Sequence, residues 1–268
     1  MKGAPDAARS DRLRRDARRD AAGLESMSSY RRRIYDAYVR AGCVGVPLKV
    51  EEAFAQQRPY LDQVVRRHFP ADRTTPVLDL GCGAGTLLAA AQAAGYARLM
   101  GVDVSPEQVA RARELGIEVR PGDLLETLRD LPEASQGVVT AFDVLEHFTK
   151  DEIVPFVDGV YRVLRPGGRW ILHLPNGASP FGGAIRYGDF THELAFTPKS
   201  LRQLLVSSGF SDIQCFEDRP VVHGVKSAAR RVVWTGIRTL LRLYLAAETG
   251  DLGRNAVLSQ NLLAVARR

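Results

Sequence analysis

Apolar positions along the chain fall into two alternating patterns. Seven short runs have the length and composition of buried strands, and they lie at 77–80, 99–103, 117–119, 137–143, 170–174, 213–216 and 261–266. The segments between them place apolar residues three or four positions apart, which is the spacing of an amphipathic helix. Strands that alternate with helices predict a mostly parallel sheet covered by helices. The pattern therefore predicts an α/β fold, and 268 residues suit one domain with an insertion.

The first predicted strand leads into the stretch 77–86, around which the rest of the chain is arranged. Its apolar run ends in an acidic residue, and Gly81, Gly83 and Gly85 follow before a helical pattern begins. Glycine lets the backbone turn tightly and approach a ligand closely, because no Cβ atom blocks it. The next strand ends at Asp103, where an acid holds the hydroxyl pair of a ribose. A strand, a glycine-rich turn and a helix predict a nucleotide site at the edge of an open sheet.

Five stretches in the right order resemble the class I S-adenosylmethionine-dependent methyltransferases. They are 79–85, 101–105, 122–124, 142–147 and 164–168, within a similar region that covers roughly residues 55–217. The resemblance implies a Rossmann-like sheet of seven strands, mostly parallel with an antiparallel last strand, and S-adenosyl-L-methionine as cofactor. A dehydrogenase is the alternative, but it would normally show G-x-G-x-x-G and a second nucleotide-binding half, and neither is visible.

The resemblance also implies which residues bind the cofactor. Asp123 would accept a hydrogen bond from the adenine amino group, and Leu124 would pack on the ring. The segment around Arg58 loosely resembles ubiquinone-pathway O-methyltransferases, in which a helix arginine binds the cofactor carboxylate; an ordinary surface arginine is the alternative. The candidate cofactor-binding residues are Arg58, Asp79, Gly81, Gly83, Gly85, Asp103, Val104, Asp123, Leu124 and Phe142.

A second polar group follows the fourth predicted strand. Asp143, Glu146 and His147 have i, i+3, i+4 spacing, which would place them on one side of a helical turn. Open α/β sheets bind ligands at that end of the strands. His192 lies in a polar segment after the fifth predicted strand and could face His147. We expect His173, within the fifth strand, to pack as an ordinary strand residue.

This polar group resembles the metal sites of two O-methyltransferase families. Small-RNA 2′-O-methyltransferases hold Mg²⁺ with E-x-x-E-H and a later histidine, and ubiquinone-pathway O-methyltransferases share E-x-x-E-H. The resemblance implies that Asp143, Glu146, His147 and His192 bind Mg²⁺ or Mn²⁺, although two imidazoles leave Fe²⁺ and Zn²⁺ open. The same four residues are the candidate catalytic group, because a hydroxyl nucleophile needs a base or a metal ion. Metal-free acid–base catalysis and a purely structural role are the alternatives.

Segments of different composition flank the predicted core, 71–218. Residues 1–26 are expected to form a disordered tail, since the first 25 residues carry seven Lys/Arg and five Asp/Glu. Residues 27–70 are expected to form a helical cap, either packed on the core or covering the substrate pocket. The segment 219–259 is predicted to be an amphipathic helical insert, and 260–268 the last core strand.

The insert combines an apolar helical face with an arginine face opposite, and it carries a surplus of five positive charges from seven Lys/Arg and two acids. We expect it to cover the acceptor site or to rest on an anionic membrane surface. A helix packed on the sheet edge or a homodimer contact is the alternative.

Composition limits the expected location of the protein and the kinds of partner that it binds. Three cysteines without close spacing favour a reduced, cytoplasmic location, at most peripheral at the inner face of a membrane. No apolar run reaches the roughly 18 residues of a spanning helix, and we expect no secretory signal in residues 1–25. The net charge of +6 hints at anionic partners, but no recognition domain or aromatic–basic surface indicates nucleic acid.

The segment T-H-E-L-A-F-T-P-K-S-L, at 191–201, resembles bacterial methyltransferases found with surface-glycan and lipopolysaccharide enzymes. The sequence therefore leads us to expect a metal-dependent O-methyltransferase whose acceptor is a sugar or glycan hydroxyl. The alternatives are a phenol or catechol of a quinone or natural product, and a cofactor-binding protein without catalysis.

Overall fold

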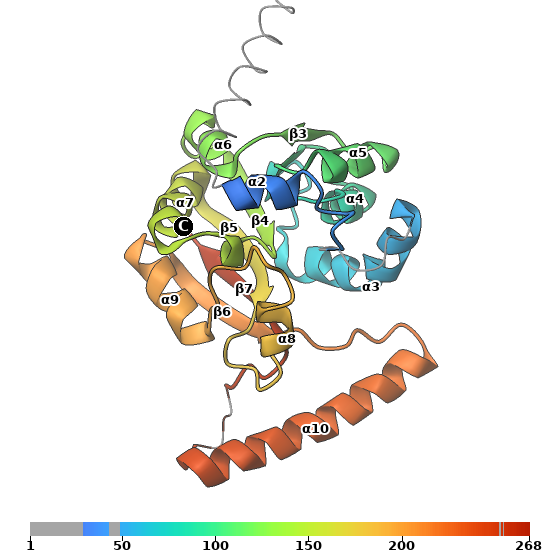
Figure 1. Ribbon diagram of the computed structural model, residues 1–268, viewed down its shortest axis with the longest axis vertical. Coiled ribbons are helices and arrows are strands. Elements are labelled where there is room, and N and C mark those ends of the chain that lie inside the picture. Colours follow the sequence, from blue (N-terminus) through green and yellow to red (C-terminus); the bar gives the residue numbers. More distant parts are fainter. Residues whose placement is uncertain (1–28, 43–48, 252, 254) are drawn as a thin grey trace, which may run out of the picture.

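The computed structural model describes residues 29–42, 49–251, 253 and 255–268, so the tail predicted for 1–26 lies outside the described residues. These residues form one seven-stranded sheet in the order β3-β2-β1-β4-β5-β7-β6 (Figure 1). The strands are β1 (Val77–Leu80), β2 (Leu99–Asp103), β3 (Val119–Pro121), β4 (Gln136–Phe142), β5 (Leu164–Pro175), β6 (Ser211–Glu217) and β7 (Asn261–Arg267). Strands β1 to β5 pair in parallel, and β7 runs antiparallel to β5 and β6. The predicted mostly parallel sheet with an antiparallel last strand is confirmed.

Helices precede the first strand and connect the strands that follow. They are α2 (Ser29–Tyr35), α3 (Val50–His68), α4 (Thr86–Ala93), α5 (Pro106–Glu114), α6 (Leu124–Asp130), α7 (Lys150–Val163), α8 (Gly183–Arg186), α9 (Pro198–Ser207) and α10 (Val225–Thr249). The third strand begins two residues later than predicted. The reason is that the Ile117 N–H closes the end of α5 by donating to the Ala112 carbonyl at 3.1 Å, so Ile117 is not free to join the ladder.

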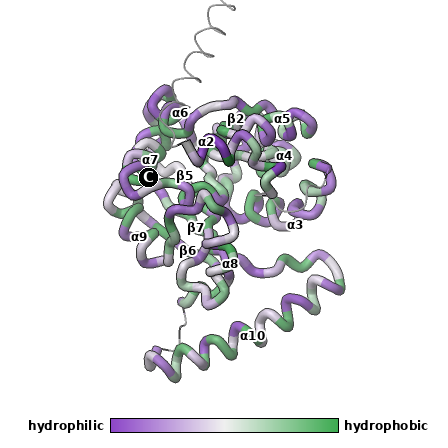
Figure 2. Tube along the Cα trace, in the orientation of Figure 1, coloured by the Kyte–Doolittle hydropathy of each residue, from purple (hydrophilic) through white to green (hydrophobic). Residues whose placement is uncertain are grey.

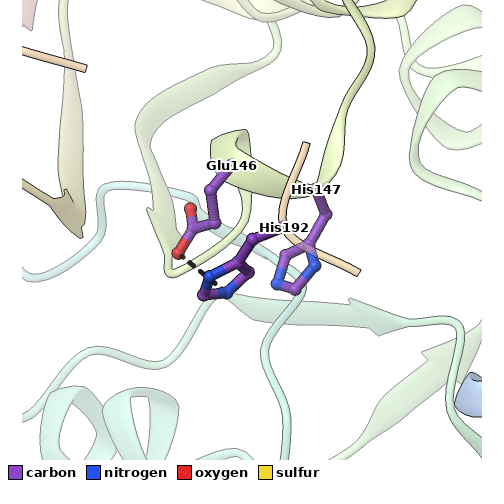
Figure 3. A group of neighbouring side chains, drawn as sticks. All are labelled: Glu146, His147 and His192. Carbon is purple, nitrogen blue, oxygen red and sulfur yellow. Dashed lines mark ion pairs between the residues drawn. The ribbon is translucent and has the colours of Figure 1, made fainter. Parts of the chain in front are cut away.

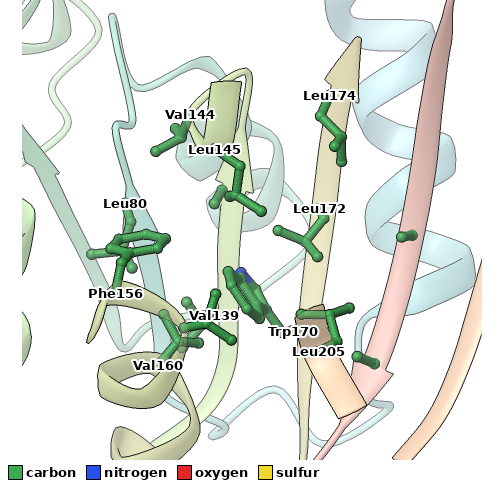
Figure 4. Packing of buried hydrophobic residues seen from close by; sticks show 14 of the residues in the cluster. Leu80, Val139, Val144, Leu145, Phe156, Val160, Trp170, Leu172, Leu174 and Leu205 are labelled. Carbon is green, nitrogen blue, oxygen red and sulfur yellow. The ribbon is translucent and has the colours of Figure 1, made fainter. Parts of the chain in front are cut away.

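Two apolar layers sandwich the sheet. On one face, Leu78 and Leu80 of β1 pack with residues of α6, α7 and α9, and Phe156 and Trp170 are fully buried there (Figure 4). The opposite face is covered by α3, α4 and α5. Because both faces are covered, the polar ligand-binding groups can only gather at the ends of the strands.

Side-chain caps fix where the helices begin. The Ser105 hydroxyl accepts the Gln108 N–H at 3.4 Å at the start of α5. Thr149 and Glu152 form a reciprocal capping box at the start of α7. The Glu152 carboxylate also accepts two hydrogen bonds from Arg31 of α2, at 3.0 and 2.8 Å. The cap that starts α7 therefore also holds α2 in place.

Helix α10 lies apart from the layered body and is joined to it by a segment at each end (Figure 1). Within α10, which is described from end to end, Ser227 is the one buried residue. Helix α10 lies within the segment 219–259, in which an amphipathic helix was predicted. Among the described residues, no helix combines the length and the apolar character needed to cross a membrane.

Gly81 supports a stability prediction because two constraints meet there. Its φ is +67°, and an added Cβ would lie 2.5 Å from the Cγ2 atom of buried Val144. Gly116 has a similar φ of +69° but nothing within 4 Å of an added Cβ. Left-handed backbone costs a non-glycine residue about 1–2 kcal/mol, and overpacking a stiff β-branched neighbour adds about 1–3 kcal/mol.

We therefore expect Gly81→Ala to lower the free energy of unfolding in urea by more than Gly116→Ala does, with the difference due to Val144. Equal losses in the two variants would show that Val144 moves aside and that the turn tolerates a side chain.

Candidate active site

A cavity of about 880 Å³ opens where β1, β2, β4 and β5 end. Parallel strands present their carboxyl ends at one edge, so the loops that follow them line the same space. Eight of the ten predicted cofactor-binding residues line this cavity: Asp79, Gly81, Gly83, Asp103, Val104, Asp123, Leu124 and Phe142. A volume in the upper part of the range for ligand pockets leaves room for a cofactor and an acceptor.

Asp103 holds the glycine-rich turn in place. One oxygen of its carboxylate accepts the Gly83 N–H at 2.7 Å, and the other accepts the Ser105 N–H at 2.8 Å. Burial raises the pKa of Asp103, while the two N–H donors oppose that effect. The acid thus fixes the turn after β1 and the start of α5 in one geometry while it faces the cavity.

Asp79 is a second buried acid beside the first. The Thr140 hydroxyl donates to its carboxylate at 2.6 Å. Burial, reinforced by the charge of nearby Asp103, raises the pKa of Asp79 to about 7. A cationic ligand in this cavity would favour its ionised form. Asp123 has a separate structural task, since it caps α6 by accepting the Glu126 N–H at 2.9 Å.

Two of the predicted cofactor residues do not line the cavity. Arg58 is 56% exposed and pairs with Asp62 at 3.5 Å, with its guanidinium against the ring of Phe54. Its neighbours on α3, Gln57 and Tyr60, face the cavity instead. Contrary to the prediction, the structure does not bring Arg58 to the cofactor site. Gly85 acts through the fold, because its φ of +74° begins α4 and an added Cβ would lie 3.1 Å from Ile117.

Glu146, His147 and His192 come together beside the cavity (Figure 3). Each offers one ligand atom, and these atoms lie within 4.8 Å of one another. Glu146 and His147 stand on a single 3₁₀ turn, Leu145–His147, directly after β4. His192 arrives on the loop between β5 and α9, as predicted.

Hydrogen bonds to backbone bring the two segments together. The N–H groups of Glu193 and Leu194 both donate to the Glu146 carbonyl, at 2.7 and 2.9 Å. Arg186 of α8 donates to the carbonyls of His192 and Glu193, at 2.5 and 2.7 Å. The loop that carries His192 is thereby fixed against the turn that carries Glu146.

Hydrogen bonds also set the tautomers of the two histidines. The Thr191 hydroxyl donates its one proton to Asp189 at 2.6 Å, so it must accept from the Nδ1–H of His147 at 2.8 Å. The Nδ1 of His192 lies 3.1 Å from the Ile185 carbonyl, which can only accept. Both rings therefore leave Nε2 without a proton in their neutral forms. Burial lowers the pKa of His147 to about 4, which keeps that ring neutral near pH 7.

Glu146 completes the cluster with an unpartnered carboxylate. Its side chain is buried, and neither oxygen has a hydrogen-bond partner. The Nε2 atom of His192 lies 3.9 Å from one of these oxygens. Burial, together with the negative charge of Asp143, raises the pKa of Glu146 well above its usual value. An isolated buried carboxylate is costly, so its surroundings call for a proton or a cation.

Asp143 departs from the predicted set. Its φ is +54°, so it precedes the turn rather than sharing a helical face with Glu146 and His147. Its carboxylate bonds to Nδ1 of His173 at 2.9 Å, and the other ring nitrogen of His173 lies 3.5 Å from Asp218. The structure thus replaces the predicted four-residue group by three residues and a separate Asp143–His173–Asp218 chain.

Our expectation for His173 missed its place in this chain. The two carboxylates raise its pKa well above the usual value, although burial opposes them. Burial would raise the pKa of Asp143, but the charge of His173 and its hydrogen bond outweigh burial and lower that pKa. His173 pairs with Phe142 in the sheet register, close to the carboxyl end of β5. Its position two residues before the end of that strand was the available signal.

Helix α2 covers this end of the sheet. Arg31, Tyr35 and Tyr38 line the cavity, and the Tyr38 hydroxyl donates to Asp189 at 3.2 Å. Tyr30 bonds to Glu193 on the loop of His192. The part of the predicted cap that is described here therefore faces the pocket and contacts the loop that forms it.

Comparison with known proteins finds relatives among methyltransferases. Residues 77–168 match the family model of a methyltransferase domain. The chain is 36% identical over 137 residues to a probable S-adenosylmethionine-dependent methyltransferase of Mycolicibacterium smegmatis, covering 50% of this chain and 51% of that protein. It is 30% identical over 154 residues to the ubiquinone biosynthesis O-methyltransferase of Idiomarina loihiensis, covering 51% and 62%. The chain thus spans about half the length of the first curated relative and somewhat more of the second.

A solved methyltransferase shows the same fold. The crystal structure of an S-adenosylmethionine-dependent methyltransferase from Archaeoglobus fulgidus superimposes with a TM-score of 0.60 at 22% identity, over 81% of this chain and 97% of that chain. The chain thus has the fold of a solved S-adenosylmethionine-dependent methyltransferase, and its residues 77–168 match a methyltransferase domain. The candidate cofactor region is the turn after β1 with the acids of β1 and β2.

Asp103 provides a test of that cofactor region. We expect Asp103→Ala to weaken S-adenosylmethionine binding by about 1.5–3 kcal/mol, the usual size for a hydrogen bond to a charged group. Calorimetry measures the change, and Glu118→Ala, which removes an exposed acid, serves as the charge control. Undiminished affinity in Asp103→Ala would exclude the assignment.

Asp79 adds a prediction for pH. Its proton must leave before the carboxylate can favour the sulfonium of the cofactor, so affinity should rise with pH. With a pKa of about 7 in the free protein, we expect about a tenfold gain between pH 6 and pH 8. Asp79→Asn should flatten this dependence, and S-adenosylhomocysteine, which has no sulfonium charge, should show a smaller slope. An equal slope in wild type and Asp79→Asn would assign the linkage to another group.

Proposed function

We propose that this chain transfers the methyl group of S-adenosylmethionine to a hydroxyl oxygen of a sugar or surface glycan, aided by a divalent cation at Glu146, His147 and His192. The observation that carries the proposal is the unpartnered Glu146 carboxylate, which faces two imidazoles with unprotonated Nε2 atoms. These three atoms all offer lone pairs, and no hydrogen is available to be shared among them. They therefore interact more favourably with a bound cation than with one another.

The donor set bears on which cation fits. One carboxylate and two imidazoles favour Mn²⁺, Fe²⁺ or Zn²⁺ over Mg²⁺, which prefers oxygen ligands. When bound, such an ion would lower the pKa of an acceptor hydroxyl and orient its oxygen. The hydrogen bonds from His147 to Thr191 and from His192 to the Ile185 carbonyl would orient both rings for this purpose. We favour Mn²⁺ from the two metals expected from the sequence.

The remaining residues position the reactants. In methyl transfer the S–CH₃ bond breaks as the O–CH₃ bond forms, and the acceptor loses its hydroxyl proton. Positioning supplies much of the rate of such a displacement. Asp103 and the glycine turn would hold the cofactor, while Tyr35 and Phe148 line the cavity and limit the access of water. Without a cation, the Nε2 atom of His147 would be the acceptor of the proton.

A glycan acceptor is supported by the segment 191–201. This stretch carries the resemblance to glycan-associated methyltransferases, and it is also the stretch that brings His192 to Glu146. Its threonine at 197 then caps α9, so the segment runs from the cluster directly into the core. The part of the chain that completes the site is therefore the part that suggests the acceptor.

A phenol or catechol acceptor is the second candidate. One relative is named as a ubiquinone biosynthesis O-methyltransferase, and aromatic side chains line the cavity at Tyr35, Tyr38, Tyr60 and Phe148. Turnover with a panel of simple sugars and catechols separates the two candidates, because both need the same cluster but different cavity walls.

His192→Ala tests the cluster. We expect it to reduce turnover by a factor of about 100 or more and to abolish Mn²⁺ binding in calorimetry, while S-adenosylmethionine affinity stays nearly unchanged. The reason is that His192 does not touch the glycine-rich turn. His68→Ala, a histidine at the end of α3 outside the cavity, is the matched control.

Exhaustive chelation followed by return of each metal completes this test. Full activity in chelator with no bound metal would exclude the cation, and His147 would then act as a general base. Bound cofactor without turnover on any acceptor would support a non-catalytic protein.

A further inference from the structure

Helix α10 presents its apolar side to solvent. The exposed fractions on this side are high, and they are Val225 88%, Val232 72%, Val233 63%, Ile237 48%, Leu240 66%, Leu243 59% and Tyr244 61%. Apolar stretches recur along the whole helix, which stands clear of the body (Figures 1 and 2). A helix normally turns its apolar stripe toward a core, so this one has the reverse orientation.

The opposite side of α10 faces the body. Arg238 contacts both oxygens of the buried Glu217 side chain, at 2.7 and 2.6 Å. Arg231 donates to the Pro220 carbonyl at 3.0 Å. Trp234 and Leu241 line a cavity of about 540 Å³ between the helix and the body. Specific polar contacts therefore hold α10 with its arginine side inward, and its orientation is defined by the fold.

We propose that the outward face of α10 docks on an anionic membrane surface. This face is defined by six of the exposed apolar residues given above, without Ile237, because Ile237 also lines the cavity between the helix and the body. Lys226 and Arg230 are exposed beside it, and the single acid of the helix, Glu248, stands near the far end. An apolar face bordered by basic residues is the pattern of a helix that lies in the interface of a charged bilayer. The net charge of +6 on the whole chain acts in the same direction.

The width of the face distinguishes a membrane from a second copy of the chain. At about 100° per residue, the apolar positions of this face lie between Val232 and Tyr244 on the helix circumference and span about 120°. A two-helix seam uses only a narrow stripe, so one partner helix would leave much of this face exposed. Lys226 lies at the edge of this arc, where an anionic lipid headgroup can pair with its charge. A lipid bilayer can therefore cover this face more completely than the α10 helix of a second copy can.

Docking in this way would place the helix along the bilayer rather than across it. A helix of 25 residues is about 37 Å long. Its arginine side and the cavity beneath it would stay on the side of the protein body, while the apolar residues enter the headgroup region. The proposal does not depend on methyl transfer, since it rests on the insert alone.

Vesicle flotation with the full chain tests the proposal. We expect binding to vesicles of phosphatidylglycerol and phosphatidylcholine in equal parts, little binding to pure phosphatidylcholine, and release by salt. Leu240→Ser with Leu243→Ser should reduce the partition coefficient about tenfold or more. Lys226→Gln and Arg230→Gln should each reduce it about fivefold at low salt.

Matched controls distinguish binding through this face from non-specific hydrophobic binding to vesicles. Val206→Ser on α9 and Val154→Ser on α7 remove apolar side chains that are 56% and 43% exposed elsewhere, and they should leave flotation unchanged. Circular dichroism and S-adenosylmethionine binding confirm that each variant is folded.

Either of two results would overturn the proposal. One is the absence of binding to the charged vesicles by folded wild-type protein. The other is a stable dimer in analytical ultracentrifugation that Leu240→Ser with Leu243→Ser converts to monomer, since the occupant would then be a second copy. Flotation that persists in a chain inactive toward every acceptor would leave the membrane site intact and reject only the proposed chemistry.

Discussion

The candidate site depends on one carbonyl oxygen. The Glu146 carbonyl accepts two N–H groups from the loop that carries His192, and so a turn after β4 and a loop after β5 become a single unit. His192 lies 46 positions after Glu146 in the sequence. Without that contact, no hydrogen bond between the two segments would fix His192 relative to Glu146 and His147. Because the oxygen belongs to the backbone, this register does not depend on the ionisation of the side chains around it. The loop is thus positioned before any ligand arrives, which is what preorganised sites require.

The cavity is acidic although the chain as a whole is basic. Asp79, Asp103 and Asp143 line it, and Glu146 lies buried next to His147, while the basic residues on its wall include Arg31, which is already paired with Glu152. Such a field suits a sulfonium cofactor and a metal ion, since both bring positive charge into a region where ionised acids would otherwise repel one another. The charge of the site is thus opposite in sign to the net charge of the chain, and the composition alone reveals only the net charge.

Sequence reasoning could predict the sheet because its signals are local and repeated. The glycine turn, the apolar runs and the caps at Thr149 and Thr197 each specify one element through nearby residues, and the order of elements then restricts the topology. The partners within the site were harder to predict. Spacing suggested that Asp143 shares a helical face with Glu146, but a left-handed backbone at Asp143 turns it toward His173. The partner of Asp143 is thus set by His173 on the neighbouring strand. The periodicity of the sequence does not show which residues of two strands become neighbours.

Strands β6 and β7 also bear on how this kind of protein can change. Glu217 at the end of β6 pairs with Leu262 near the start of β7, so the segment that holds α10 leaves the sheet and returns to it at adjacent positions. A segment joined in this way adds little constraint to the rest of the fold, because the hairpin closes whatever its length. The connection between β6 and β7 is therefore a place where related proteins can carry different inserted segments. The appendage at this corner and the cavity at the ends of β1, β2, β4 and β5 can therefore change independently of each other.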